Sequence, residues 1–233
     1  AYVSGLYTFD VVGLTTAGES KYWAHGPGSR FEHYERLVRS APHRFPTHFI
    51  VYQQWMACDP VLGRELFEAV VTDQSILGGT RMTVFEARKD LLGSGDKPVM
   101  IASSGDYADS LDVADLESEK DHGYEVFQAG LTETSNRVHK EYLSDDGEEE
   151  EELVDLAQQR AFADGGRFER TWDRFFARLP AGKSVRGIAR LVGGTSGATV
   201  TVSVAGSVVV TLSLPSSRAK EYEFVIPAAA ASD

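Results

Sequence analysis

The sequence predicts a mainly β protein, an antiparallel β-sandwich of jelly-roll type with two or three short helices in its connections. About nine or ten short runs rich in β-forming residues are separated by turn signals, and this spacing is typical of sandwiches rather than of parallel α/β folds. One domain over residues 1–233 is expected. With 42% apolar residues, including 12 Phe, 9 Tyr and 3 Trp, the chain can form one sizeable core.

The first half of the chain combines one helix with several strands. Residues 2–14 are rich in β formers and predict one or two strands. Residues 30–39 predict a helix that prolines end, because the apolar side chains recur at helical spacing on one stripe: Phe31, Tyr34, Leu37 and Val38. A strand is expected from His48, followed by three extended runs within 65–79, 80–92 and 97–105.

The second half is acidic at first and then β-rich. Residues 106–121 predict an acidic, weakly structured segment, and the chain is expected to be extended again from Tyr124. A helical stripe is expected at Leu153, Leu156 and the aliphatic stem of Arg160. The segment 166–180 fits a helix or a strand, and a strand is favoured because everything after it has a β pattern.

The clearest β signal is the stretch ATVTVSVAGSVVVTLSLP at 198–215. It predicts a hairpin in which Val204 pairs with Val208, Val202 with Val210 and Val200 with Leu212, so that the apolar residues share one face. This register requires a three-residue connection, Ala205-Gly206-Ser207. The opposite face would carry Thr201, Ser203, Thr211 and Ser213.

The order of segments in the last quarter of the chain resembles the closing strands of jelly-roll carbohydrate-binding modules. The matching pattern is FERTWDRFFARLPAG, SVRGIARLVGG, ATVTVSVAG, VVVTLSLPSS and YEFVIPA. Such modules often carry a strand of the form W…F…LPAG and then paired Val/Thr strands around a glycine turn. The pattern is similar also to viral and appendage jelly rolls. No ligand-binding residue of these families maps onto this chain, and the resemblance implies a fold rather than a site.

The charge balance narrows the range of partners. The formal net charge is −12, and a field of that sign repels phosphate backbones and anionic lipid headgroups. Nucleic acid and insertion into a membrane are therefore not expected, and no apolar stretch approaches the roughly 20 residues that span a bilayer. Glu148–Glu152, within the acidic loop at 144–153, should be exposed to solvent or matched to basic residues of another chain.

Candidate metal ligands lie among the acidic residues. Asp106, Asp109 and Asp112, with Asp115 after them, could form an oxygen-rich calcium loop. The spacing of an EF-hand is absent, and a solvated acidic loop is the simpler interpretation. Apart from calcium, no cofactor is expected. His43 and His48 lack a third ligand at a recognised zinc spacing.

Candidate glycan-binding and catalytic residues are few. Tyr22, Trp23 and Tyr107 could stack on sugar rings if they are exposed, whereas Trp55 and Trp172 are expected in the core. Cys58, the single cysteine, lacks a cysteine-protease signature and should be a small buried apolar residue. No pair of catalytic carboxylates can be chosen among 35 acidic residues.

These observations favour a non-enzymatic structural or interaction protein. We expect a β-sandwich subunit that presents a surface to other protein subunits or to a glycan in an oligomer or larger assembly, as an outer or decorating component. Two alternatives are a hydrolase or lyase acting on polysaccharide and a small glycan-binding module. An enzyme should show two carboxylates with perturbed pKa values that converge in a pocket, and a glycan-binding module should show exposed aromatic side chains on one sheet face.

Overall fold

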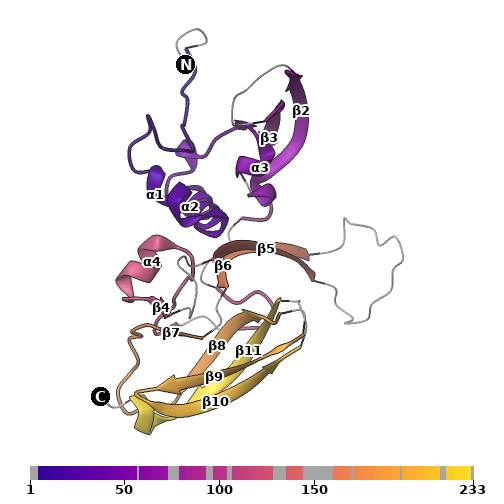
Figure 1. Ribbon diagram of the computed structural model, residues 1–233. Coiled ribbons are helices and arrows are strands. Elements are labelled where there is room, and N and C mark those ends of the chain that lie inside the picture. Colours follow the sequence, from indigo (N-terminus) through magenta and orange to yellow (C-terminus); the bar gives the residue numbers. More distant parts are fainter. Residues whose placement is uncertain are drawn as a thin grey trace. The chain divides into compact units, whose positions relative to one another are not determined.

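The computed structural model describes residues 5–56, 58–72, 79–92, 97–103, 107–127, 135–143, 160–168, 171–194, 196–215 and 219–231 (Figure 1). The helices and 3-10 turns are α1 (Ser20–His25), α2 (Pro27–Ser40), η1 (Pro42–Arg44), α3 (Gln53–Met56), η2 (Asp59–Val61), α4 (Leu116–Asp121) and η3 (Ala228–Ala231). None of the helices in these ranges is long and apolar enough to cross a bilayer.

Strands outnumber helices in residues, which confirms the mainly β prediction: 37% of the chain is strand and 22% helix. The strands are β1 (His48–Val51), β2 (Leu62–Val70), β3 (Arg81–Ala87), β4 (Glu125–Phe127), β5 (Ser135–Leu143), β6 (Arg160–Phe168), β7 (Trp172–Arg174), β8 (Val185–Val192), β9 (Ala198–Val204), β10 (Ser207–Leu214) and β11 (Ala219–Ile226). They form one three-stranded sheet, β1-β3-β2, and four two-stranded pairs, β4-β7, β5-β6, β8-β11 and β9-β10. Every pair with a resolved register is antiparallel.

The chain groups into two compact units. Unit 1 consists of residues 1–95, 112–140 and 161–175, and unit 2 consists of residues 96–111, 141–160 and 176–233. The expectation of a single β-sandwich domain over 1–233 stays a prediction.

The core of unit 1 is built on the helix that the sequence predicts. Helix α2 begins at Pro27, whose fixed φ suits a first helical position, and it ends just before Pro42. Its stripe residues Phe31, Tyr34 and Leu37 are buried, as expected. The Tyr34 ring meets the rings of Phe45 and Phe49 edge-on, at centroid distances of 6.0 and 5.5 Å. These ring contacts pack α2 against strand β1.

The same core includes Cys58. This residue is fully buried, as predicted, and burial raises the pKa of its thiol, which removes its nucleophilic character.

The strand expected near the N-terminus is absent from residues 5–14, where the prediction was wrong. The Asp10 carboxylate instead accepts hydrogen bonds from the backbone N–H groups of Val12, Gly13 and Thr15, at 3.1, 3.3 and 2.7 Å. An aspartate that binds the following backbone in this way forms a turn and removes those donors from any sheet.

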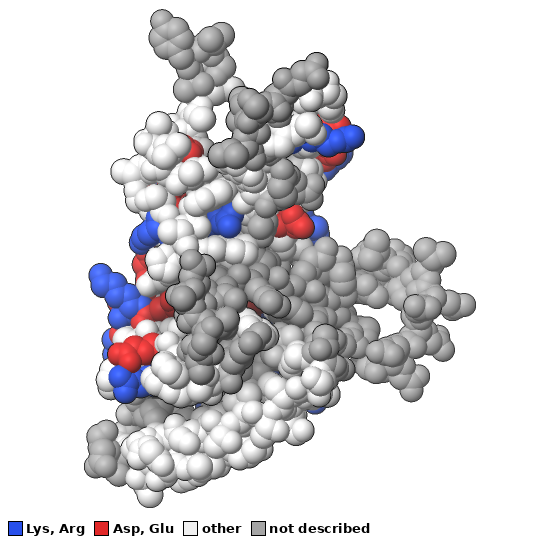
Figure 2. Space-filling model, viewed as in Figure 1, with Lys and Arg blue, Asp and Glu red and all other residues white. Residues whose placement is uncertain are grey.

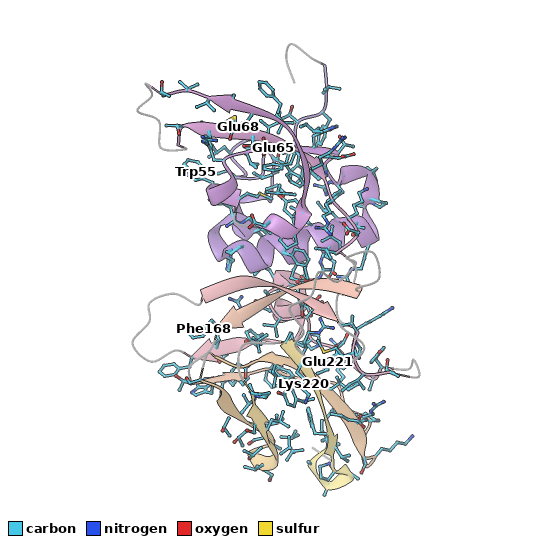
Figure 3. The ribbon with its side chains drawn as sticks, turned by 90° about the vertical axis from the view of Figure 1, so that its right-hand side faces the viewer. Trp55, Glu65, Glu68, Phe168, Lys220 and Glu221 are labelled. Carbon is cyan, nitrogen blue, oxygen red and sulfur yellow. The ribbon has the colours of Figure 1, made fainter. Side chains whose placement is uncertain are left out.

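Unit 2 is organised around the β8–β11 pair. Glu221 of β11 is buried, and Figure 3 labels it beside Lys220 of the same strand. Its carboxylate accepts hydrogen bonds from Arg190 at 2.9 Å and from three consecutive backbone N–H groups, those of Val99, Met100 and Ile101, at 2.7 to 2.9 Å. These contacts explain why residues 97–103 are not a strand, contrary to the prediction: their donors bind a side chain rather than a neighbouring strand.

The β9–β10 hairpin confirms most of the predicted register and corrects its turn. Val202 pairs with Val210 and Val200 with Leu212, but Val204 pairs with Ser207. The connection therefore has two residues, Ala205 and Gly206, with φ values of 48° and 78°, as a type I′ turn requires. A bulge between Val208 and Val210 absorbs the extra residue and returns the valines to one face.

Burial within the hairpin only partly follows the expectation. Leu212 is buried and Val200, Val202, Val204 and Val210 are half-buried, whereas Val208 beside the bulge is 66% exposed. Thr201, Ser203, Thr211 and Ser213 are exposed, as predicted.

Two predictions fall wholly or partly outside the described residues. These are the exposed run Glu148–Glu152 and the helical stripe at Leu153 and Leu156. Arg160, the third member of that stripe, begins strand β6.

The strained position in the hairpin turn generates a stability prediction. Ala205 adopts the left-handed region, which costs a residue with a Cβ about 1–2 kcal/mol, while asparagine tolerates it. We expect Ala205→Asn to raise the free energy of unfolding by about 0.5–1 kcal/mol and Ala205→Val to lower it. Urea titration of both variants and the wild type measures these changes. Equal stabilities for the two variants would contradict the turn geometry.

Candidate functional site

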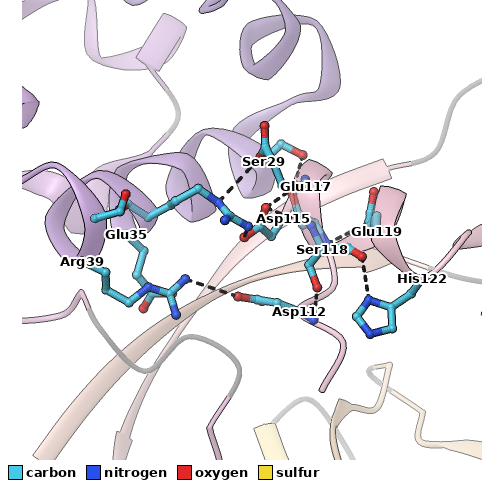
Figure 4. A network of polar contacts seen from close by, with 12 residues as sticks. Ser29, Glu35, Arg39, Asp112, Asp115, Glu117, Ser118, Glu119 and His122 are labelled. Atoms are coloured by element: carbon cyan, nitrogen blue, oxygen red, sulfur yellow. Dashed lines mark hydrogen bonds and ion pairs between the residues drawn. The ribbon is translucent and has the colours of Figure 1, made fainter. Parts of the chain in front are cut away.

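The candidate site lies in unit 1, on the side of α2 that carries charged residues. Helix α2 is buried on almost every side, and Glu32, His33 and Glu35 are buried together with its apolar stripe. Buried charges require partners. Glu32 binds strand β6, His33 lies 2.8 Å from Glu19, and Glu35 faces Arg39 of the same helix. Arg36 of α2 pairs with Asp115, and Figure 4 shows the part of this polar network that joins α2 to α4.

The segment that leads into α4 corrects the prediction of a solvated acidic loop. Asp112 is 6% exposed and Asp115 is also buried. The Asp115 carboxylate caps α4 by accepting hydrogen bonds from the backbone N–H groups of Glu117 and Ser118, and it pairs with Arg36 of α2. The backbone N–H of Asp112 donates to the Ser118 hydroxyl at 2.9 Å. The acidic residues therefore fold this segment onto α2 and β6 instead of facing water.

Three carboxylates converge between these elements. One oxygen each from Glu32, Glu35 and Asp112 lies within 4.8 Å of the other two. Glu32 and Glu35 are one helical turn apart on α2, which places both side chains on the same face. Arg39, on the next turn, lies 3.9 Å from both Glu35 Oε2 and Asp112 Oδ2.

Close approach of β6 to α2 completes the cluster. The backbone N–H of Gly165 donates to Glu32 Oε1 at 2.6 Å. A Cβ at position 165 would lie 2.7 Å from that oxygen and 2.7 Å from the Gly28 carbonyl oxygen, so only glycine fits.

The crowding of negative charge shifts the pKa values of the cluster. Burial, together with the charges of Asp112, Asp164 and Glu35, raises the pKa of Glu32 well above its usual range. Burial, with the charges of Asp164, Glu35 and Asp115, raises the pKa of Asp112 to about 8. The repulsion between these negative charges must be offset by protons or by a cation.

Outside the three-carboxylate cluster, acidic residues of α4 pair with basic residues. Arg167 of β6 forms a bidentate ion pair with Glu119 at 2.5 Å. Glu117 accepts hydrogen bonds from Lys21 and from the Tyr22 hydroxyl, the latter at 2.8 Å. These two donors outweigh partial burial and lower the pKa of Glu117 to about 2. Glu117 thus keeps its negative charge, in contrast to Glu32 and Asp112 of the central cluster.

The remaining predicted metal ligands do not join this cluster. Asp106 lies outside the described residues. Asp109 belongs to unit 2, where its carboxylate accepts a hydrogen bond from the backbone N–H of Arg178 at 2.6 Å. His43 lies in η1 and His48 begins β1, where its ring contacts the Thr47 hydroxyl. Of the predicted ligands, Asp112 alone meets two further carboxylates in the described residues.

The predicted sugar-stacking residues lie in different environments. Tyr22 is 7% exposed and its ring stacks on His33 at 3.8 Å, which leaves no open face for a sugar. Trp23 is half-buried under the Arg30 guanidinium, and Tyr107 is exposed in unit 2. Trp55, labelled in Figure 3, is also exposed rather than in the core.

An exposed aromatic pair occurs elsewhere in unit 1. Phe127 of β4 and Trp172 of β7 are cross-strand partners, and their rings stack at 5.6 Å. They are 49% and 44% exposed, so the expectation of a buried Trp172 was wrong. Arg174 of β7, which pairs with Glu125, places its guanidinium 5.7 Å from the centre of the Trp172 ring.

Sequence reasoning missed Glu32 and Glu35. On a helical wheel they fall beside Arg36 and Arg39, and such a charged side normally faces solvent. The sequence contains only a weak indication of this cluster, because its three carboxylates and the glycine lie in segments far apart along the chain.

An open cavity lies away from the carboxylates. It has a volume of about 520 Å³ and is lined by residues 62–64 and 86–90, at the start of β2 and the end of β3. Glu32 and Asp112 do not line it. Two carboxylates with perturbed pKa values do converge, but in the described structure they are buried rather than open to a polysaccharide.

Comparison with protein-family models, with curated proteins and with solved structures finds no match to this chain.

The contacts of Glu117 lead to a prediction about the stability of the protein in acid. A carboxylate with a lowered pKa stabilises the folded state above its ordinary pKa, and this contribution is lost as the pH falls toward the folded value. We expect Glu117→Gln to lower the free energy of unfolding by up to about 1 kcal/mol at pH 7, because Glu117 is partly exposed. The difference from the wild type should shrink between pH 4.5 and about 2.

Denaturant titrations at several pH values measure this effect, and Glu65→Gln on the exposed side of β2 is the control (Figure 3). A deficit that persists unchanged below pH 3 would contradict the assigned ion pair.

Proposed function

We propose that this chain is a non-enzymatic structural subunit that assembles with further copies of itself through the β9–β10 hairpin. The observation that carries this proposal is the absence of charge from 198–215 in a chain with a net charge of −12. Figure 2 shows this surface as a broad white area. Copies of an acidic chain repel one another least where their surfaces are uncharged.

The edge of the hairpin is suited to assembly. Within the described part of the chain, β9 is hydrogen-bonded on one side only, to β10. Proteins usually protect such an edge with charged residues, with proline or with a bulge in the edge strand. Strand β9 has no charged residue and no proline, and the bulge of the hairpin is in β10. Its backbone groups are available to another strand.

The sequence of β9 favours a second copy as the partner. In an antiparallel pair of two β9 strands centred on Thr201, Val200 of one copy would face Val202 of the other, and Thr199 would face Ser203. Valine then pairs with valine, and hydroxyl side chains pair with hydroxyl side chains. A two-fold interface requires this self-complementarity. The half-buried valines would extend the contact toward the roughly 1,000 Å² of a stable interface.

We infer further that strands β8 to β11 belong to a β-sandwich of jelly-roll type, the fold implied by the resemblance to carbohydrate-binding modules. Two antiparallel pairs, β8–β11 and β9–β10, support this inference, and β10 lies beside β11 (Figure 1). In such a fold an unpaired edge strand is a natural contact between subunits.

A charged substitution tests the assembly. Thr201→Lys would place two like charges opposite each other at the centre of the paired edges, so we expect the oligomer of the wild type to become monomeric. Sedimentation velocity over a range of concentrations measures the change. The control is Thr211→Lys, at the exposed cross-strand neighbour of Thr201 on β10, which should still assemble through β9. A wild type that stays monomeric up to its solubility limit would contradict the proposal.

A second candidate function is glycan binding at the Phe127–Trp172 pair. Stacked, half-exposed aromatic rings with charged neighbours offer the apolar face and polar rim on which sugar rings stack. This candidate would replace subunit assembly as the role of the chain, and it uses a different unit.

We expect Trp172→Ala to weaken binding to a glucan or chitin oligosaccharide about tenfold, which is the loss of one stacking contact. A glycan array followed by titration of the best ligand measures this effect. Phe176→Ala, an exposed aromatic side chain in unit 2, should leave the affinity unchanged. An array without binding, or equal affinities for both variants, would exclude the pair as a sugar site.

A further inference from the structure

We propose that Glu32, Glu35 and Asp112 form a binding site for one divalent cation, with calcium preferred. This site has a different ligand set from the aspartate loop that the sequence suggests. It is independent of the assembly proposed for unit 2, since all three residues belong to unit 1.

The key observation is an oxygen atom without a partner. Glu32 is 0% exposed, and its Oε1 accepts a hydrogen bond from the Gly165 N–H. Its Oε2 is buried and has no hydrogen-bond partner in the described structure. Leaving a buried carboxylate oxygen without a hydrogen-bond partner destabilises the folded state. A cation bound to this oxygen would remove that destabilisation.

The spacing of the oxygens fits a calcium ion. Three atoms within 4.8 Å of one another have a common centre no more than about 2.8 Å from each, and calcium–oxygen distances are about 2.3–2.6 Å. A shift of a few tenths of an ångström closes the site on calcium. Magnesium requires about 2.1 Å and therefore a larger contraction of the helix and loop. Zinc prefers nitrogen or sulfur ligands, and this ligand set has only oxygen.

The local charge also favours a cation. Besides Glu32, Glu35 and Asp112, the negative charge of Asp164 acts on the cluster, whereas Arg39 contributes one positive charge at its edge. Figure 4 shows Arg39 reaching Asp112 from one side, with Glu35 on the same helix. A doubly charged cation would reduce the excess of negative charge and would connect α2 to the segment before α4.

Metal binding by the full chain tests the proposal. After removal of metals with a chelator, calorimetric titration with calcium chloride should give one site per chain, with a weaker response to magnesium chloride. Calcium at a hundred times its Kd should raise Tm by about 5–10 °C. Glu32→Gln and Asp112→Asn should each weaken calcium binding tenfold or more, roughly the effect of one lost charged ligand. Glu65→Gln, which removes one exposed carboxylate, should bind like the wild type.

A second measurement separates this site from the glutamate run at 148–152 and does not depend on variants that fold. Manganese bound at the cluster should selectively broaden the NMR signals of the Gly165 and Asp112 amides in the wild type. Broadening confined to residues 144–153, or calcium affinities unchanged in both Glu32→Gln and Asp112→Asn, would overturn the proposal. So would a wild type whose Tm does not respond to calcium.

Discussion

The structure of unit 1 depends on the burial of a charged helix. Because α2 is covered on almost every side, its carboxylates cannot be solvated and must bind groups from elsewhere in the chain. The Gly165 N–H on β6 binds Glu32, and Asp115 at the start of α4 binds Arg36. The packing of β6 and of residues 112–119 around α2 thus follows from a requirement for polar partners as well as from apolar contact.

The sequence predicts the parts of this fold that local patterns determine. The stripe of Phe31, Tyr34 and Leu37 correctly places α2, since helical period and apolar burial agree there. Alternation of valine with threonine correctly pairs Val202 with Val210, because a register slip would mix the two faces. The predicted turn was one residue too long. A β-bulge can absorb an extra residue and leave the apolar side chains on the same face, so the alternation of apolar and polar residues does not show that a bulge is present.

Long-range polar contacts could not be predicted in the same way. Asp112 was identified as a possible ligand from its neighbours in sequence, yet the carboxylates it meets lie about eighty positions earlier, on α2. Glu221 resembles any charged residue of a strand until it binds the backbone N–H groups of residues 99–101. The environments of Asp112 and Glu221 depend on which distant segment packs over each side chain. The charge and the periodicity of the sequence do not show which segment that is.

The interleaving of the two units has a consequence for the order in which the protein forms during synthesis. The chain passes back and forth between the units, and unit 1 is complete only when residue 175 has been made. Glu32 leaves the ribosome 133 residues before Gly165, a delay of roughly 7–27 s at ~5–20 residues per second. Through that interval α2 lacks its final cover, so its carboxylates remain hydrated and its aromatic stripe is open to chaperones.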